Sequence, residues 1–430
     1  MKLMVVGHPF LLAYNQKKYV AMKRLDPGLH LRLLVPDRWC ERFDWRACEI
    51  HPGLSPQEVT PLHSWPRGWH MTYLHNPVRV AAALRDFQPD VIHIEEEPQA
   101  LITVETIILR NAFAPRAALS AFTWDNLLRR RRLPLGALKR GLRRFSLRHL
   151  SAMSCGNRRA SELLRAEALF AGEIAILPQH GLDEAEHHPG RELPLRSRLG
   201  LEGVPVIGYL GRMVPEKGLR LLFNALSTLQ EYSWKLLLVG SGPLEEEIRQ
   251  RWMAELPGRI VLLPPVPYDQ VAQYLRCTDV FALPSYSSPT WSEQFGLTLA
   301  QAMMLGIACI GSSAGAIPDV LGPGGLGFAE SSASGLARAL QSLIRSPGQR
   351  KLFGDRGRHF ALANYTAETV AGKYLAFFEQ ARRSHIPRSR VPQTRAPRTQ
   401  VPQSEKTQRA FAVSPSPESA HATKVYSSKS

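Results

Sequence analysis

The chain has few cysteines and no long apolar run, and each lack excludes a class of protein. Its five cysteines are odd in number, scattered and free of Cys-x-x-Cys spacing, so neither a disulfide framework nor a zinc framework is expected. No uninterrupted apolar run is long enough to span a bilayer. The first apolar stretch is too short for a signal peptide and has no small-residue cleavage site. We therefore expect reduced thiols and a cytoplasmic location.

The remaining composition is typical of an ordinary globular protein with more than one domain. The chain has 430 residues, enough for two or three domains, and its 44% apolar and 21% charged residues allow ordinary cores. We expect two domains at 1–178 and 179–362, a last helix at 363–383 and a tail at 384–430. The tail is rich in Pro, Ser, Thr, Gln and Arg and poor in apolar residues, which predicts disorder.

Strand and helix patterns alternate through the first half, which predicts a doubly wound α/β domain. The expected strands are the apolar runs at 3–7, 31–35, 89–94, 117–122, 150–154 and 174–178. Glu97 follows the third run, and Asp125 and Asn126 follow the fourth. At the ends of parallel strands these side chains are candidates for ligand contacts. A solvated loop acid at Glu97 and a helix cap at Asp125 or Asn126 remain the alternatives.

Residues 291–306 combine an acid, an amide and the start of a helix. The run Leu297–Leu305 has strong helix formers and no proline, so a helix is expected to begin just after Gly296. A helix start carries unpaired N–H groups and a partial positive charge, which suit a phosphate. Glu293 precedes this helix, and Gln301 lies about one turn inside it. The segment predicts a site for a ligand with both phosphate and hydroxyl groups.

An earlier strand, turn and helix in the second half add two cations. The apolar run 204–211 is followed by Arg212, by Lys217 and by a periodic helical segment at 219–229. Ligands bind at the carboxyl ends of strands in an open parallel sheet, and Arg with Lys suits a diphosphate. Two cations near a turn are also typical of a solvated surface. A second strand that ends in glycine, at 234–240, favours the binding site.

In chain order, these segments resemble one known family, the large group 1 (family 4-like) retaining glycosyltransferases with the GT-B fold. This family includes sucrose synthases and bacterial phosphatidylinositol mannosyltransferases. The resemblance is strong over residues 204–327 and weaker in the first half. The positions that carry it are Gly211, Arg212, Glu216, Lys217, Gly218, Leu237 to Pro243, Pro284, Ser285 and the Glu293 segment. It implies an α/β protein with two facing Rossmann-like, doubly wound domains. The first domain would bind the acceptor, the second the nucleotide-sugar donor, with the active site in the cleft between them.

The resemblance also implies a role for each matching residue. Arg212 and Lys217 would hold the donor diphosphate, and Glu293 would contact hydroxyls of the donor sugar, so these three are expected to carry catalysis. The other donor contacts are expected at Gly7, Gly211, Phe295, Gly296, Leu297 and Gln301. Front-side attack would retain the configuration of the sugar, and the leaving diphosphate would take the acceptor proton. The scheme needs a nucleotide diphosphate sugar as co-substrate but no cofactor and no metal.

The sequence departs from the family pattern at three positions. Gln301 stands where relatives have a second Glu for the ribose hydroxyls, so an acceptor oxygen remains but a charge-assisted bond, roughly twice as strong, is lost. Only Gly7 remains of a Gly-Gly loop after the first strand. Many relatives also carry a His after the strand at 117–122, which is missing here. Glu97, Asp125 and Asn126 are therefore the candidates on the acceptor side.

Three histidines, His180, His187 and His188, invite an interpretation as metal ligands. They lie in a segment that resembles the interdomain turn of the same family. We therefore expect no metal site.

A basic segment indicates the kind of acceptor. The formal net charge is +17, and much of the charge before the tail lies in Arg129–Arg148, where apolar residues recur at near-helical spacing. Such a helix can lie on an anionic membrane surface, although a domain helix with a solvated basic face fits as well. The segment lacks interleaved aromatics, so nucleic acid is not expected. We expect a glycan or lipid-linked acceptor, with the protein in the cytoplasm or on the inner face of the cell membrane.

Two other functions are compatible with these motifs. One is a nucleotide-sugar epimerase or hydrolase on the same fold, which would need further acid–base groups in the cleft. The other is a non-catalytic homologue that binds nucleotide sugar without turnover. The last helix, at 363–383, is expected to cross back to the first domain, as the last helix commonly does in GT-B enzymes.

Overall fold

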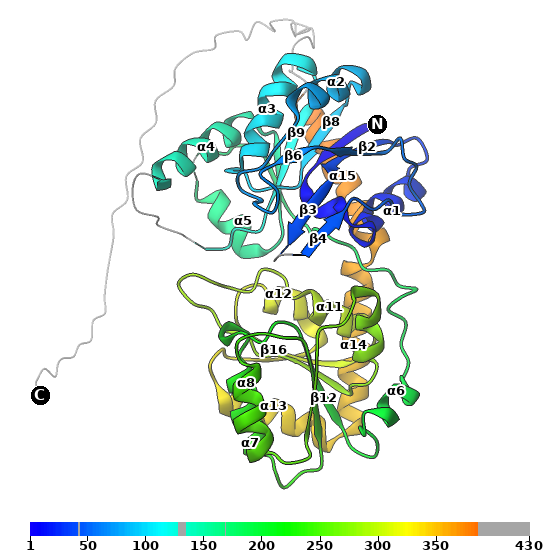
Figure 1. Cartoon of the computed structure of the whole chain (residues 1–430), viewed down its shortest axis with the longest axis vertical. Helices are drawn as coiled ribbons and strands as arrows, with labels where there is room; N and C mark the ends of the chain where they lie inside the picture. Colours follow the sequence, from blue (N-terminus) through cyan, green and yellow to red (C-terminus); the bar gives the residue numbers. More distant parts are fainter. Residues whose placement is uncertain (42–43, 128–134, 168, 386–430) are drawn as a thin grey trace, which may run out of the picture. The chain divides into compact units, whose positions relative to one another are not determined.

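A seven-stranded parallel sheet organises the first half of the chain (Figure 1). The computed structural model describes residues 1–41, 44–127, 135–167 and 169–385. The strand order is β11-β10-β9-β8-β1-β2-β5, and each neighbouring pair is parallel. The strands are β1 (Lys2–Val6), β2 (His30–Pro36), β5 (Val59–Leu62), β8 (Val91–Ile94), β9 (Ala118–Thr123), β10 (Ala152–Cys155) and β11 (Glu173–Ile176). Most of them are short apolar runs because helices cover both faces.

Alternate residues of β1 enter two different cores, as the pleat of a strand requires. Met4 and Val6 pack with α2 (Pro77–Phe87), α3 (Leu101–Phe113), α4 (Leu135–His149) and α5 (Arg158–Arg165). Leu3 and Val5 pack with α1 (Lys17–Leu25) and α15 (Ala367–His385) on the other face. Two short hairpins extend this half, β3 (Arg38–Glu41) with β4 (Asp44–Ala47) and β6 (Ser64–Trp65) with β7 (Leu74–His75). Two 3-10 helices, η1 (His8–Leu11) and η2 (Ala13–Gln16), precede α1.

A six-stranded parallel sheet organises the second half, with the order β14-β13-β12-β15-β16-β17. Its strands are β12 (Val206–Leu210), β13 (Lys235–Val239), β14 (Ile260–Leu263), β15 (Val280–Leu283), β16 (Ala308–Ser312) and β17 (Leu326–Phe328). The strand order reverses between β12 and β15, and ligands bind beside such a reversal in open α/β sheets.

Helices cover both faces of the second sheet as well. One core includes residues of α6 (Leu193–Arg198), α10 (Val271–Leu275), α11 (Leu297–Met304), α12 (Ile317–Leu321) and α14 (Pro347–Tyr365). The other includes residues of α7 (Leu219–Ser227), the π-helix η4 (Ile248–Trp252) and α13 (Ala333–Arg345). Single turns complete this half: η3 (Pro215–Lys217), α8 (Glu245–Glu247), α9 (Met253–Glu255), η5 (Tyr268–Gln270) and η6 (Gly322–Gly324).

The chain passes between the two sheets twice, and the two passages pair with each other. Leu182 and Thr366 form a parallel bridge, in which the Leu182 N–H donates to Tyr365 O and the Ala367 N–H donates to Leu182 O, both at 2.8 Å. After this bridge α15 packs against α1 and the first sheet. Residues Met1–Ile386 accordingly form one compact unit.

The single helix predicted at 363–383 was wrong at both ends. The helix α14 ends at Tyr365, Thr366 is extended with φ −64° and ψ 152°, and a new helix begins at Ala367. The Thr366 Oγ1 accepts a hydrogen bond from the Thr369 N–H at 3.1 Å, which caps the new helix. The helix α15 continues to His385, into the range 384–430 predicted as a tail; the rest of that range lies outside the described residues. No helix in the described part of the chain combines the length and apolar character that a membrane crossing requires.

Candidate active site

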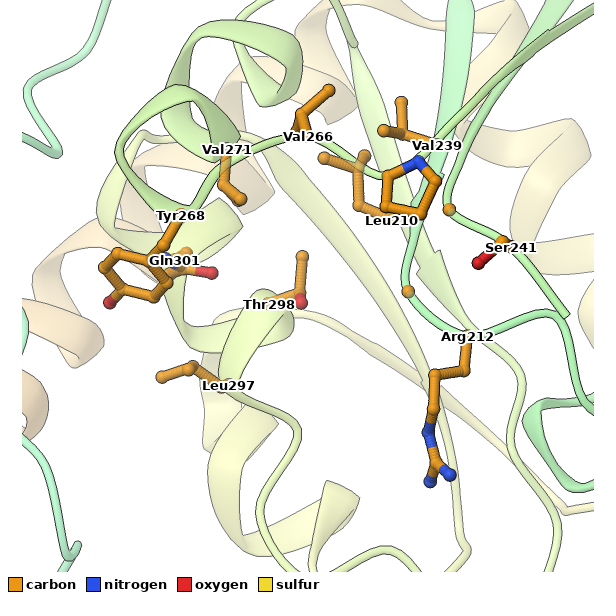
Figure 2. A pocket seen from close by; sticks show the side chains of 13 residues that line it. Leu210, Arg212, Val239, Ser241, Val266, Tyr268, Val271, Leu297, Thr298 and Gln301 are labelled. Carbon is orange, nitrogen blue, oxygen red and sulfur yellow. The ribbon is translucent and has the colours of Figure 1, made fainter. Parts of the chain in front are cut away.

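A cavity of about 290 Å³ lies at the carboxyl ends of β12 and β13, against the start of α11 (Figure 2). The cavity lies where the strand order reverses between β12 and β15, which is where open α/β sheets bind their ligands. Four of the predicted donor residues line it, Gly211, Arg212, Leu297 and Gln301. The rest of the lining is Leu210, Val239, Gly240, Ser241, Pro265, Val266, Tyr268, Val271 and Thr298.

Two glycines let the main chain form this cavity. Gly240 has φ +147°, and a Cβ there would lie 2.0 Å from the Gly211 carbonyl oxygen. Gly296 has φ +87°, a left-handed conformation that favours glycine, and caps α11 without a side-chain hydrogen bond. The first residues of the helix, Leu297 and Thr298, line the cavity. Their N–H groups have no acceptor inside the helix, so the start of α11 is suited to an anion.

Arg212 is exposed, on the loop that follows β12. Its main chain is fixed because the Tyr209 hydroxyl donates to Arg212 O at 2.6 Å and the Gly211 N–H donates to Val239 O at 3.0 Å. In Figure 2 the Arg212 side chain lies on the side of the cavity opposite Gln301, and its guanidinium points toward the lower edge of the view. The cavity therefore has a cation at one end and a buried amide at the other.

Lys217 is paired with Glu293. The Lys217 Nζ lies 2.6 Å from Glu293 Oε2, and the two side chains are 15% and 9% exposed. The Ser285 hydroxyl donates to the same carboxylate oxygen at 3.2 Å, and the Trp291 ring centroid lies 5.3 Å from Lys217 Nζ. The residues predicted for the diphosphate and for the sugar are therefore in direct contact, although neither lines the 290 Å³ cavity.

The loop that carries Glu293 is held from several sides. The Ala316 N–H and the Asn126 Nδ2 each donate to the Glu293 carbonyl oxygen at 2.9 Å. Asn126, predicted to bind hydroxyls or to cap a helix, thus contacts the main chain of this loop. The ring of Phe295 packs 6.0 Å from Trp124 and 5.6 Å from Tyr365, so Phe295 anchors the loop before Gly296.

Gln301 lies on the second turn of α11 and is 2% exposed. Its Nε2 lies 3.3 Å from His187 Nε2, and it is close enough to the Tyr268 hydroxyl to affect the pKa of that group. The Tyr268 ring stacks on Tyr14 with the centroids 4.2 Å apart. Gln301, which was predicted to contact the donor, is therefore part of a buried polar cluster with His187 and Tyr268.

A second cavity, of about 740 Å³, is lined by Glu97 and by the acidic turn after β8. The Thr123 hydroxyl donates to Glu97 Oε2 at 2.6 Å, and the Trp124 N–H donates to Glu97 Oε1 at 2.8 Å. Burial, with the neighbouring Asp125 charge, raises the pKa of Glu97 to about 7. Glu97 therefore changes charge near neutral pH, which a solvated loop acid would not do.

The remaining predicted residues lie beside these cavities. Neither lining includes Gly7, Asp125 or Asn126. The Gly7 N–H donates to Leu34 O at 3.2 Å, and a Cβ at Gly7 would lie 2.9 Å from Glu95 Cβ. Gly7 thus lets the first strand pack against the turn after β8.

Sequence reasoning missed several residues of the larger cavity. The His8 Nδ1 atom is in hydrogen-bond contact with Glu96 Oε1, and the His8 ring stacks on Trp39 with the centroids 4.8 Å apart. Glu95 accepts hydrogen bonds from Lys18 Nζ at 2.6 Å and from the Tyr19 hydroxyl at 2.8 Å. The run of three glutamates was the visible signal. No local pattern connects it to residues near position 18.

The three histidines that invited a metal interpretation have other surroundings. His180 lines the larger cavity, His187 contacts Gln301, and exposed His188 contacts the carbonyl of Pro189. Among the described residues, no group of three or more His, Cys, Asp or Glu side chains has a metal-binding arrangement.

The two doubly wound sheets and the paired crossings define a GT-B fold, as predicted. Sucrose-phosphate synthase from Thermosynechococcus elongatus has a similar structure, with a TM-score of 0.66 and 19% identity over 88% of this chain and 98% of that one. Anabaena HepE in complex with UDP-glucose is also similar, with a TM-score of 0.62 and 16% identity over 88% of this chain and 99% of that one.

Residues 194–360 match the family model described as Glycosyl transferases group 1, so the family recognised from the motifs is confirmed for this segment. One similar relative is the 2-deoxystreptamine glucosyltransferase of Streptomyces kanamyceticus, 27% identical over 246 residues, which are 55% of this chain and 62% of the relative. The chain thus spans about half to three fifths of the length of this relative and of two other curated transferases that it matches. The motifs predicted a glycosyltransferase, and the proteins of the matching family and these relatives are glycosyltransferases.

Proposed function

We propose that the chain is a retaining glycosyltransferase that moves a sugar from a nucleotide diphosphate sugar to an acceptor hydroxyl. The observation that carries this proposal is the cavity at the ends of β12 and β13, with Arg212 at one end and the start of α11 beside it. A helix start and a guanidinium together suit a diphosphate. The similar Anabaena protein was crystallised with UDP-glucose, which supports a nucleotide-sugar donor.

Each residue of the site has a separate proposed role in the reaction. Arg212, Lys217 and the first N–H groups of α11 would stabilise the charge on the departing diphosphate, and removing one such donor typically costs about 3–4 kcal/mol of transition-state stabilisation. Glu293 would bind hydroxyls of the transferred sugar. The leaving phosphate would accept the acceptor proton during front-side attack. This scheme needs no cofactor and no metal.

The larger cavity is proposed as the acceptor site. It is large enough for one or more sugar rings, and its wall includes the aromatic side chains of Trp39, Trp124 and Tyr14. Glu97 and Glu96 supply carboxylates for acceptor hydroxyls. We propose a glycan or lipid-linked acceptor.

A basic surface on α4 supports contact with an anionic membrane. Arg140, Arg144 and Arg148 are exposed on this helix, and Leu138 near its start is 59% exposed. Arg143 is not part of this surface, because it pairs with Glu167. Part of the predicted basic segment, residues 128–134, lies outside the described residues. The protein is proposed to act in the cytoplasm, on the inner face of the cell membrane.

A vesicle assay tests this surface. Changing Arg140, Arg144 and Arg148 together to Glu should abolish co-sedimentation with phosphatidylglycerol vesicles, because each basic side chain near such a surface contributes about 1 kcal/mol. The matched control changes the exposed Arg338, Arg345 and Arg356 of the second half to Glu. Equal loss in both variants would show a net-charge effect and refute a local surface.

A thermal-shift screen of nucleotide sugars tests the proposed function itself. A donor at 100-fold its dissociation constant should stabilise the protein by about 2.7 kcal/mol. Arg212→Ala should remove most of the shift, whereas Arg220→Ala, which removes an exposed arginine paired with Glu247, should leave it intact. Equal shifts in wild type and Arg212→Ala would refute the donor site.

The two rival functions give other results in the same system. An epimerase or hydrolase would convert the donor without an acceptor, and the donor products would show it. A non-catalytic homologue would bind the donor but yield no product with any acceptor.

A further inference from the structure

The partners of Gln301 determine which end of its amide faces the donor cavity. Gln301 and His187 are both 2% exposed, and the Gln301 Nε2 lies 3.3 Å from the His187 Nε2. The other ring nitrogen of His187, Nδ1, lies 2.8 Å from the main-chain oxygen of Asp183. Each nitrogen of this ring therefore has one neighbour.

The Asp183 contact fixes the tautomer of His187. A carbonyl oxygen only accepts hydrogen bonds, so the Nδ1 atom must carry the proton and donate. Burial lowers the pKa of His187 below its ordinary value, so the ring is neutral at pH 7. The Nε2 atom of a neutral ring protonated at Nδ1 is an acceptor. Only the amide nitrogen of Gln301 can face an acceptor, so its carbonyl oxygen is turned away from His187.

We propose that His187 is a positioning residue that holds the amide of Gln301 so that its carbonyl oxygen accepts a hydrogen bond from a ribose hydroxyl of the donor. Gln301 lines the donor cavity, and in Figure 2 its side chain points into it, beside Tyr268. This inference rests on the proposed function. The contact with His187 also gives a reason for glutamine at this position. Both oxygens of a glutamate carboxylate are acceptors, so one of them would face the Nε2 atom of His187, which is also an acceptor.

The position of His187 is itself fixed by the second half of the chain. The Arg358 Nη1 donates to the His187 carbonyl oxygen at 3.2 Å, and the His187 N–H donates to Asp183 O at 3.2 Å. The charged and titratable groups that act on the ring or its cluster are Asp183, Glu186, Lys17, Tyr268 and Tyr14, besides Arg358 at the main chain.

Two substitutions of His187 separate its two contacts. His187→Asn keeps an amide N–H near the Nδ1 position but removes the acceptor at Nε2. His187→Gln has the length to place an amide oxygen near Nε2, so it should restore the hold on Gln301. The exposed neighbour provides the control His188→Ala.

The measurement is calorimetric titration with UDP, GDP and ADP and with their 2′,3′-dideoxy analogues. For the nucleotide that binds most tightly, wild type should prefer the ribose form. His187→Asn should weaken the ribose form by about threefold to tenfold, the effect of one neutral hydrogen bond, and leave the dideoxy form unchanged. His187→Gln should recover most of the loss. Equal weakening of both forms, or no recovery, would overturn the proposal.

Gln301→Glu gives an independent readout through pH. Its carboxylate would pair with His187 only when the ring is protonated, and this pairing raises the pKa of the ring. The pairing is therefore present at low pH and is lost as the pH rises through that pKa. The preference for ribose over dideoxy nucleotide should be at least about tenfold greater at pH 6 than at pH 8 in this variant, and nearly constant in wild type. A constant preference in both proteins would overturn the proposal.

These outcomes are distinct from failure of the proposed function. If wild type bound none of the nucleotides, the donor site itself would be refuted. If it bound them but showed no preference for ribose, only the role of His187 and Gln301 would be refuted.

Discussion

Removing the carboxylate of Glu293 should tighten the binding of a nucleoside diphosphate while it slows sugar transfer. The Glu293 Oε2 atom lies 2.6 Å from the Lys217 ammonium. A diphosphate must compete with this carboxylate for Lys217. Hydrogen bonds to charged groups contribute about 1.5–3 kcal/mol. Because Lys217 is 15% exposed, we take the lower end, and about 1.4 kcal/mol corresponds to tenfold in affinity.

Glu293→Gln should therefore bind the nucleoside diphosphate about tenfold more tightly, whereas Lys217→Met should bind it at least about tenfold more weakly. Turnover of the complete nucleotide sugar by Glu293→Gln should fall by about 10²–10³, because a contact to the reacting sugar is lost. Calorimetric titration gives the affinities and product formation gives the turnover. The control Glu247→Gln removes a carboxylate paired with Arg220 outside the site. If Glu293→Gln weakened nucleotide binding as Lys217→Met does, the competition argument would be refuted.

Three further variants test other parts of the structure. Burial raises the pKa of Glu97 to about 7, so kcat/KM for the acceptor should rise with pH through about 7, and a pH profile of Glu97→Gln should lack this step. Gly240→Ala should lower the free energy of unfolding by about 2–3 kcal/mol in urea titrations, whereas Gly327→Ala, where a Cβ meets open space, should change it little. Lys18→Met leaves the buried Glu95 without its cation and should cost about 3–5 kcal/mol in the same titrations; loss below 1 kcal/mol would contradict the pairing.

Local patterns predicted the parts of the structure that local sequence determines. The run Leu297–Leu305 without proline predicted a helix after Gly296, and α11 begins at Leu297. The apolar runs that end in Gly211 and Gly240 predicted β12 and β13. The carboxyl ends of the strands in a parallel sheet lie at one edge, so Arg212 was expected near the start of α11. Arg212 and the first residues of α11 do line the same cavity.

Contacts between distant positions had no local signal. The pairing of Lys217 with Glu293 joins residues 76 positions apart, and the contact of His187 with Gln301 joins residues 114 apart. The break at Thr366 was missed because no proline or glycine lies within five residues of it. Only the bridge to Leu182 and the side-chain cap make an extended conformation favourable there.

A crystal structure of the protein with its preferred nucleoside diphosphate tests the central claim most directly. We expect the diphosphate to lie between Arg212, Lys217 and the first N–H groups of α11, and a ribose hydroxyl to lie within hydrogen-bond distance of Gln301 Oε1. A diphosphate bound away from Arg212 and the start of α11 would contradict it.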